Sequence, residues 1–278
     1  MTLLYGKPVA DKIFDDTKRR IESSGITPGL AVILVGDDPA SRIYVGLKEQ
    51  TAGRIGMLFE KHGFSASAAQ DEIIAAIETL NQQKNIHGII VQLSLPDGFD
   101  TDRIIAAIAP EKDADGFHQE TLKRLFSGDK GSYPVLPIAV LELLRATRET
   151  LVGKNAVVVV NSELLGQVMT QVLRLEGIHA EFILADRIEA EPMRLKSARI
   201  VISACGIPNL IKGDMLQLGV IVIDAGITRV GDVVVGDIEQ DSVGAVASFL
   251  TPVPGGVGPV TVATLLARVT AAASPESV

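Results

Sequence analysis

Tyr44 and Lys48 are the pair of side chains in this sequence whose types and spacing could do chemistry. Residues four apart lie on one face of a helix, so a phenol and an amine would project together if the segment is helical. Both groups are among those that transfer protons in catalysis. The alternative is a surface lysine beside a half-buried tyrosine, which the spacing alone favours.

The elements expected around Tyr44 and Lys48 help to decide between a functional pair and a surface lysine beside a half-buried tyrosine. A continuous apolar run at 30–35 predicts a buried strand, and Gly36 followed by Asp-Asp-Pro predicts a turn. Pro39 suits the first turn of the helix that would carry Tyr44 and Lys48. The pair would then lie just beyond the carboxyl end of a strand, where open α/β sheets bind their ligands.

Strands and helices alternate along the chain, which predicts an α/β fold with parallel strands covered by helices on both faces. The expected strands are 30–35, 57–61, 88–93, 156–160, 180–184, 199–203 and 220–224. The expected helices are 8–21, the one with Tyr44 and Lys48, 71–82, 102–108, 137–148, one that ends at 175, 189–196 and 260–273. A turn-rich segment at 128–134 divides them into two lobes, and the second lobe begins like the mononucleotide-binding half of a Rossmann sheet.

Two polar features stand at the ends of apolar segments in the first lobe. Gln92 ends a strand of Ile and Val, so it either caps the backbone of its neighbours or reaches into a cleft at the carboxyl end. The loop at 110–118 carries three acids within five residues, Glu111, Asp113 and Asp115, which is also the composition of a plain solvated loop.

Composition excludes several classes of function. A formal net charge of −8 argues against binding nucleic acid through a broad basic surface. A single cysteine, Cys205, excludes an internal disulfide, and the four histidines show no metal-ligand spacing, so we expect no metal site. No apolar stretch is long enough to cross a membrane and the N-terminus lacks the features of a signal peptide, so we expect a soluble cytoplasmic protein.

Several motifs, in order along nearly the whole chain, carry a resemblance to a known family. They are Gly-Asp-Asp-Pro-Ala-Ser at 36–41 with Tyr44 and Lys48, Gly-Ile-Ile-Val-Gln-Leu at 88–93, Lys-Asp-Ala-Asp-Gly-Phe at 112–117, Ile-Asp-Ala-Gly-Ile at 223–227, Gly-Asp-Ile at 236–238 and Thr-Pro-Val-Pro-Gly-Gly-Val-Gly-Pro at 251–259. The sequence resembles the bifunctional methylenetetrahydrofolate dehydrogenase/methenyltetrahydrofolate cyclohydrolase family.

The resemblance implies a two-lobed subunit, usually a homodimer, with tetrahydrofolate derivatives bound in a cleft between the lobes. The expected lobes are residues 1–136 plus 258–278, which form the catalytic folate-binding lobe, and 137–257, a Rossmann-type dinucleotide-binding lobe. By the same resemblance, Lys48 is the catalytic lysine, Tyr44 its partner, Gln92 the glutamine bonded to the lysine and Asp115 the anchor of the pterin ring. The loop against the folate would contain Pro254, Gly255, Gly256 and Gly258.

The chemistry of this family fits those residue types. Hydride leaves the methylene carbon between two folate nitrogens, and water then attacks the resulting methenyl cation. A neutral lysine suits such a site better than an ammonium, and burial lowers a lysine's pKa because it disfavours the charged form. We therefore expect Lys48 to assist the attack of water and Asp115 to accept hydrogen bonds from the pterin.

The dinucleotide lobe departs from the family pattern. The family's Gly-Arg-Ser is Val160-Asn161-Ser162 here, which loses a turn glycine and an arginine that would pair with the 2′-phosphate of NADP, whereas Gly166 is retained. Asp186 follows the next strand where an acid would bond a ribose diol and repel a 2′-phosphate, and the adjacent Arg187 would do the opposite. The other expected cofactor residues are Ala204, Cys205, Gly206 and Ile227, with the cysteine as packing rather than a nucleophile. The family's Pro-Cys-Thr-Pro is Pro-Val-Leu-Pro at 134–137.

Three interpretations of the dinucleotide site follow. The first is a bifunctional enzyme that uses NADP, the second uses NAD with Asp186 on the ribose, and the third has lost the dehydrogenase and keeps the cyclohydrolase or only folate binding. The family pattern places the first ahead. A binding module without turnover is the alternative from another class, because a fold does not determine a function.

Overall fold

The computed structural model describes residues 1–231 and 233–274 and divides the chain into two compact units. Unit 1 comprises Met1–Ala10 and Leu125–Thr261, and unit 2 comprises Asp11–Arg124 and the segment that starts at Val262. Each unit is therefore built from two separate stretches of chain. Two of the three boundaries fall inside the long helices α1 (Gly6–Ser24) and α10 (Val257–Ala273), and the third falls near the end of a shorter helix, between Arg124 and Leu125.

Unit 2 is organised around a three-stranded parallel sheet in the order β3-β2-β4. Its strands are β2 (Gly29–Val35), β3 (Leu58–Phe64) and β4 (Gly88–Val91). Every residue of β2 and β4 is buried, which is what a continuous run of Val, Ile and Leu in a central strand requires. The sequence extended the last strand to residue 93, but β4 ends at Val91, and Gln92 leaves the ladder.

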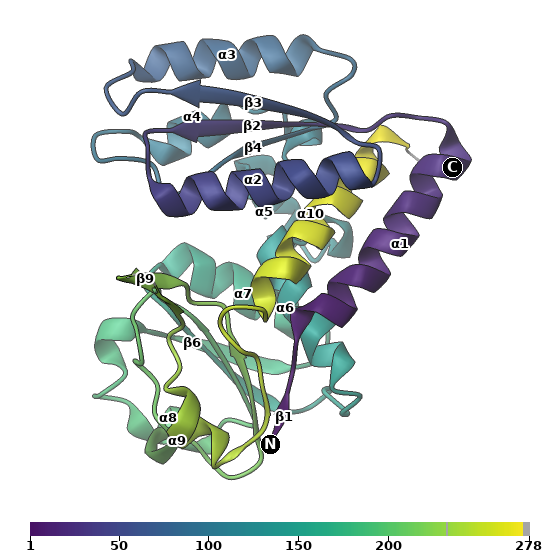
Figure 1. Ribbon diagram of the computed structural model, residues 1–278. Coiled ribbons are helices and arrows are strands. Elements are labelled where there is room, and N and C mark those ends of the chain that lie inside the picture. The colour runs from purple at the N-terminus through teal and green to yellow at the C-terminus, as the bar shows by residue number, and fades with distance from the viewer. Residues whose placement is uncertain (232, 275–278) are drawn as a thin grey trace. The chain divides into compact units, whose positions relative to one another are not determined.

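Helices cover both faces of this sheet, with α3 on one side and α2 on the other (Figure 1). The helices of unit 2 are α2 (Pro39–Arg54), α3 (Gln70–Gln82), α4 (Thr101–Ala106), the short η1 (Pro110–Lys112), α5 (Gln119–Phe126, which runs into unit 1) and the parts of α1 and α10 within its bounds. Ile73 and Ile77 of α3 and Ile104 of α4 pack against Ile33 and Ile89. Because side chains alternate along a strand, the opposite face is left to Leu30, Val32 and Gly88.

Unit 1 contains a six-stranded, all-parallel sheet in the order β1-β11-β8-β7-β5-β6. Its strands are β1 (Thr2–Leu3), β5 (Asn155–Val160), β6 (His179–Leu184), β7 (Ile200–Ala204), β8 (Val220–Asp224) and β11 (Ala247–Leu250). A separate antiparallel hairpin joins β9 (Thr228–Val230) to β10 (Val233–Val235). The α/β class and the two-lobed Rossmann-type architecture expected from the sequence are confirmed.

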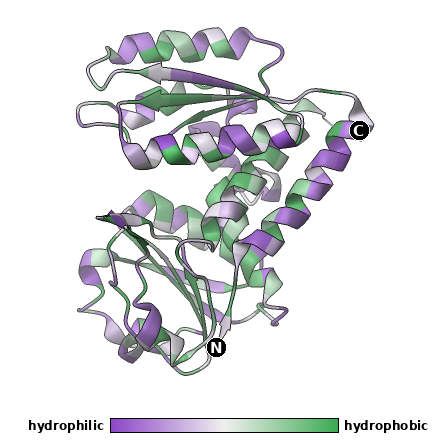
Figure 2. Cartoon of the chain, in the orientation of Figure 1, coloured by the Kyte–Doolittle hydropathy of each residue, from purple (hydrophilic) through white to green (hydrophobic). Residues whose placement is uncertain are grey.

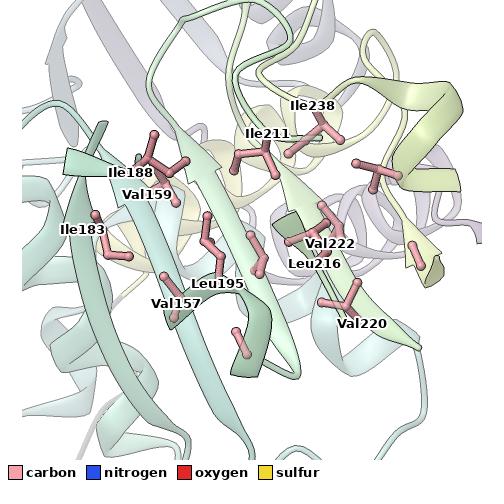
Figure 3. Close-up of a cluster of buried hydrophobic side chains, with 14 of the residues drawn as sticks. Val157, Val159, Ile183, Ile188, Leu195, Ile211, Leu216, Val220, Val222 and Ile238 are labelled. Carbon is pink, nitrogen blue, oxygen red and sulfur yellow. The ribbon is translucent and has the colours of Figure 1, made fainter. Parts of the chain in front are cut away.

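A buried aliphatic cluster fills one face of this sheet (Figure 3). Val157 and Val159 of β5 pack there with Val220 and Val222 of β8 and with Leu195. The helices of unit 1 are η2 (Lys130–Ser132), α6 (Val135–Ala146), α7 (Glu163–Leu175), η3 (Ala185–Arg187), α8 (Pro192–Ser197), η4 (Gly213–Met215) and α9 (Gln240–Gly244). Apolar residues occupy β2 and much of α10, whereas β3 carries several polar residues and α1 and α3 alternate apolar and polar residues (Figure 2). Over residues 1–231 and 233–274, none of the helices has the length and hydropathy needed to cross a membrane.

Candidate active site

Helix α2 presents Tyr44 and Lys48 as the spacing predicts. The Asp38 carboxylate caps the helix by accepting a hydrogen bond of 2.7 Å from the Ser41 amide, and Pro39 occupies the first turn. Both side chains of the pair are partly buried. The cap and the proline therefore fix where this helix begins after β2, and with it the direction of the pair.

Gln92 joins β4 to Lys48. The Lys48 Nζ donates to Gln92 Oε1 at 2.8 Å, and Gln92 Nε2 donates to the Leu93 carbonyl at 2.9 Å. The Gln92 backbone amide also donates to the Ile33 carbonyl at 2.9 Å, which holds the residue against β2. One end of this side chain bonds backbone, which is the first alternative that the sequence left open, and the other end bonds the lysine.

Charges near Lys48 are set by burial and by one carboxyl group. Burial lowers the pKa of Lys48, and the negative charge of Asp115 opposes that shift. Burial raises the pKa of Asp115, and the negative charge of Asp113 raises it further. The positive charges of Lys48 and Arg268 act in the opposite direction. Burial also raises the pKa of Tyr44, so the phenol keeps its proton at neutral pH. Burial therefore favours the neutral form of the Lys48 amine and the protonated form of the Tyr44 phenol.

Asp113 organises the loop that carries Asp115, a role that sequence reasoning missed. Its buried carboxylate accepts hydrogen bonds from the amides of Gly116, Phe117 and His118, at 2.9–3.3 Å, and from Thr121 Oγ1 at 2.8 Å. Asp113 also pairs with Ile89 in an isolated parallel bridge beside β4. The acids of this loop thus have different environments, which their spacing in the sequence does not reveal.

Arg268 is the second residue of unit 2 that the sequence did not single out. It lies on α10, is partly buried and interacts electrostatically with Asp113 and Asp115. Burial lowers its pKa, and the two carboxylates act in the opposite direction. The signal available in the sequence was an arginine within an otherwise apolar helix.

The dinucleotide residues of unit 1 gather where the strand order reverses. From β5 the chain moves to β6 on one side and then to β7 on the other, so the switch point lies between β5 and β7. The Asn161 Nδ2 spans this point by donating to the Cys205 carbonyl at 2.5 Å. Val160 is fully buried as the last residue of β5 and pairs with Leu184 and Ala204, so it is an ordinary strand residue rather than an obstruction at a turn.

Helix α7 begins immediately after this edge. Ser162 is its N-cap and accepts from the Leu165 amide at 3.4 Å. A Cβ on Gly166 would lie 2.5 Å from Phe182 Cδ2 and 2.6 Å from Phe182 Cγ, so glycine allows α7 to pack closely on β6. The free amides of the first turn therefore lie at the carboxyl edge of the sheet, which suits the phosphates of a dinucleotide.

Asp186 and Arg187 lie side by side in η3, directly after β6, and both are exposed. No hydrogen bond or ion pair holds either side chain among the residues that the structure describes. Both are therefore available to a ribose or its 2′-phosphate. Gly206, at φ +67°, and the exposed Ile227 border the same edge, where Thr228 Oγ1 donates to the Gly206 carbonyl at 2.8 Å.

Two buried aspartates tie together the loops of this edge. Asp237 accepts from Ser203 Oγ and the Cys205 amide, each at 2.7 Å, and from the Ile207 amide at 2.8 Å. Asp224 accepts from the amides of Gly226, Asp237 and Ile238, and its burial raises its pKa to about 7. Burial also raises the pKa of the Cys205 thiol to about 11, so this cysteine is a packing residue.

The segment Pro254 to Gly258 belongs to unit 1, whereas Tyr44, Lys48, Gln92 and Asp115 belong to unit 2. Gly255 and Gly256 have local reasons to be glycine. Gly255 has φ +102°, and a Cβ on Gly256 would lie 2.6 Å from the Pro252 carbonyl oxygen. Gly255 also accepts from the Gly6 amide at 2.8 Å. Within residues 1–231 and 233–274, no three His, Cys, Asp or Glu side chains cluster as metal ligands.

These features define an α/β protein that combines a Rossmann-type dinucleotide unit with a second unit centred on a buried lysine. Family models agree with both halves. The tetrahydrofolate dehydrogenase/cyclohydrolase catalytic domain matches residues 4–115, and the NAD(P)-binding domain of the same family matches residues 134–277.

Known relatives match over nearly the whole chain. The bifunctional protein FolD of Nautilia profundicola is 42% identical over 279 residues, covering 98% of this chain and 97% of that protein. The FolD crystal structure from Campylobacter jejuni has a TM-score of 0.92 at 38% identity, with 99% of each chain covered. The FolD structure from Trypanosoma brucei, complexed with NADP and an inhibitor, has a TM-score of 0.92 at 31% identity over 97% of this chain and 96% of that one. The chain belongs to the tetrahydrofolate dehydrogenase/cyclohydrolase family, as its motifs indicated.

Proposed function

We propose that this protein oxidises methylenetetrahydrofolate to methenyltetrahydrofolate with NADP and hydrolyses the product to formyltetrahydrofolate. The observation that carries the proposal is the hydrogen bond of 2.8 Å from Lys48 Nζ to Gln92 Oε1, at a lysine whose pKa is lowered by burial. Family membership and the bifunctional names of the relatives support both activities.

In the hydrolytic step, the neutral Lys48 Nζ takes a proton from the water that attacks the methenyl carbon. Gln92 orients the amine, because its carbonyl oxygen accepts one N–H and leaves the nitrogen lone pair for that proton. Tyr44 supplies a protonated phenol on the same helix face, and Asp115 binds the pterin ring. Pro254, Gly255, Gly256 and Gly258 would contact the folate.

In the oxidative step, NADP accepts the hydride when it is bound. The residues that would hold it are Asn161 and Ser162 just before α7, Asp186 and Arg187 after β6, Ala204 to Gly206 at the end of β7, and Ile227. Val160 and Gly166 are buried, so they contribute backbone shape rather than side-chain contacts. The close packing of α7 on β6 and the exposed η3 pair fit a dinucleotide at this edge.

A direct assay separates the two activities. Loss of the methenyl absorbance without any dinucleotide measures the cyclohydrolase, and oxidation of methylenetetrahydrofolate with NADP, with NAD or with neither measures the dehydrogenase. We expect Lys48→Met to abolish the hydrolysis while the folate still binds. Full hydrolytic turnover by Lys48→Met would contradict the proposed role of the lysine.

The exposed Asp186 favours NAD as the second candidate cofactor, because an acid there bonds a ribose diol and repels a 2′-phosphate. Arg187, in the same turn, favours NADP, and the NADP complex of the Trypanosoma brucei relative supports that choice. Faster oxidation with NAD than with NADP would assign the site to NAD.

The protein is further proposed to be a cytoplasmic homodimer. A single cysteine whose thiol is buried suits a reducing compartment. Ile43 and Leu47 of α2, 55% and 48% exposed, form an apolar pair that a second copy would cover. Light scattering on the purified chain measures the mass, and cell fractionation measures the location.

A further inference from the structure

The C-terminal part of α10 packs directly on β4, at a glycine. A Cβ on Gly88 would lie 2.6 Å from Val269 Cγ2, so only glycine allows this helix to approach the strand. The same Cβ would lie 3.0 Å from the Ala114 Cβ. Val269 and Ala114 therefore meet at one point on the sheet of unit 2.

The residues next to these two in the chain are Arg268 and Asp115. The segment with Ala114 runs along β4, because the Ala114 amide donates to the Ile89 carbonyl at 3.3 Å and Asp113 pairs with Ile89. Backbone packing thus brings the guanidinium of α10 to the loop that bears the carboxylate. The two side chains interact electrostatically, and both are partly buried.

Asp113 and Asp115 differ in how their charges are balanced. Asp113 has four hydrogen-bond donors, three amides of its own loop and the Thr121 hydroxyl of α5. Among the described residues, no donor is recorded for the Asp115 carboxylate, and its opposite charges are those of Lys48 and Arg268. If Lys48 gives up its proton, Arg268 is the cation that remains beside Asp115.

We propose that Arg268 is a positioning residue for the hydrolytic step: its permanent charge balances Asp115, so that Asp115 stays ionised for the pterin while Lys48 is neutral. The inference rests on the proposed function and extends it to a residue outside the lysine, tyrosine, glutamine and aspartate set. A guanidinium suits this role because it stays protonated at any pH at which the enzyme works.

The other charged and titratable groups around Lys48, Asp115 and Arg268 do not take over the role of the Arg268 charge. Tyr44, on the same helix face as Lys48, is neutral at working pH. Asp113 adds a negative charge that Arg268 also faces. Arg124, at the C-terminal part of α5, faces Arg268 as a like charge. Removing the Arg268 charge therefore leaves Asp115 without its permanent counter-charge, and the negative charge of Asp115 favours the protonated form of Lys48.

The test is the pH dependence of the cyclohydrolase in the intact protein. The rate of methenyltetrahydrofolate hydrolysis by the wild-type protein, corrected for the uncatalysed rate at each pH, should fall as the pH is lowered and Lys48 takes up a proton. This fall is the acid limb of the pH profile. Arg268→Gln and Arg268→Met should both move this limb to higher pH by about one unit, the scale on which one nearby charge acts, with about tenfold lower activity on its acid side. Arg268→Lys, which keeps the charge, should restore the wild-type limb.

A matched control removes another arginine that contacts α10. Arg20 of α1 donates to the carbonyl of Ser274, the residue after α10, at 2.7 Å. Arg20→Gln therefore perturbs the end of α10 without changing Lys48, Asp115 or Arg268, and it should leave the acid limb in place. An unchanged limb in both neutral Arg268 variants, with lower activity at every pH, would show a structural role and overturn the inference. If one of the two neutral variants fails to fold, the other neutral variant and Arg268→Lys decide the test. A shift of the acid limb in Arg268→Lys, which keeps the charge, would also overturn the inference. Absence of hydrolysis by the wild-type protein would instead refute the proposed function.

Discussion

Replacing Gly166 with alanine should damage the dinucleotide unit and leave the lysine site intact. The new Cβ would lie 2.5 Å from Phe182 Cδ2, whereas ordinary van der Waals contact begins near 3.4 Å, so about 0.9 Å of separation is missing. The Phe182 ring has little freedom to relieve this clash, because its own Cβ, fixed to β6, would also be only 3.1 Å away. Helix α7 must therefore move away from β6.

Two opposing effects set the size of the change. Alanine in a helix is more favourable than glycine by about 1 kcal/mol, whereas overpacking a well-packed contact costs about 1–3 kcal/mol. The clash at Phe182 lies below any distance that real Cβ atoms adopt, so overpacking should prevail and the melting temperature should fall by a few degrees. Displacing the first turn of α7 by most of an ångström should lower kcat/KM for NADP by up to about 100-fold.

The assay compares both activities in one preparation. Oxidation with NADP should fall, whereas hydrolysis of methenyltetrahydrofolate without a dinucleotide should keep its wild-type rate. Adding Phe182→Leu to Gly166→Ala removes the ring atoms and should recover part of the NADP activity. Wild-type KM for NADP and an unchanged melting temperature in Gly166→Ala would refute the packing argument.

Three further changes test other parts of the structure. Asp237→Ala leaves Ser203 Oγ and two loop amides without their acceptor, at a cost of about 1–3 kcal/mol for each buried group. Unfolding by denaturant should therefore show a clear loss of stability, and equal unfolding midpoints for variant and wild type would exclude a structural role of Asp237. Arg187→Gln should lower kcat/KM for NADP by about 10-fold or more and spare that for NAD, and equal effects on both would exclude contact with the 2′-phosphate. Burial lowers the pKa of Lys48, and the proposed mechanism uses its neutral form, so wild-type hydrolysis should rise with pH through that pKa and be lost below it. A flat profile from acid to neutral pH would contradict the proposed role of the lysine.

The sequence predicted the fold best where strands are long and apolar. The interval 220–224 agrees with β8 at both ends, and 30–35 differs from β2 by a single residue, because a continuous run of Val, Ile and Leu has few other stable arrangements. The short strands β1, whose two residues are exposed, and β11, which has four residues, were missed, since their positions depend on pairing with neighbouring strands rather than on local pattern. The predicted helix 260–273 begins three residues earlier, at Val257.

The sequence predicted those parts of the candidate site that depend on local pattern and missed those that depend on tertiary packing. Spacing on one helix placed Tyr44 with Lys48, and the polar end of an apolar strand marked Gln92. Neither pattern could show that Asp113 accepts four hydrogen bonds while Asp115 accepts none among the described residues. Nor could it show that Arg268 acts on Asp115 from 153 residues further along the chain, because that depends on tertiary packing at Gly88. Val160, which replaces a turn glycine of the family pattern, lies inside the β5 ladder, and its local sequence did not show this.

The division of unit 2 into two stretches has a consequence for how the protein is made. Between Arg124 and Val262 the ribosome must add the 137 residues of Leu125–Thr261, which takes roughly 7–27 s at the usual speed of synthesis. Throughout that interval the nascent catalytic sheet lacks the helix that packs at Gly88, and Asp115 lacks its permanent counter-charge. The lysine site therefore matures only after the dinucleotide unit has been synthesised, so a half-made chain would not hydrolyse its substrate ahead of the oxidation that produces it.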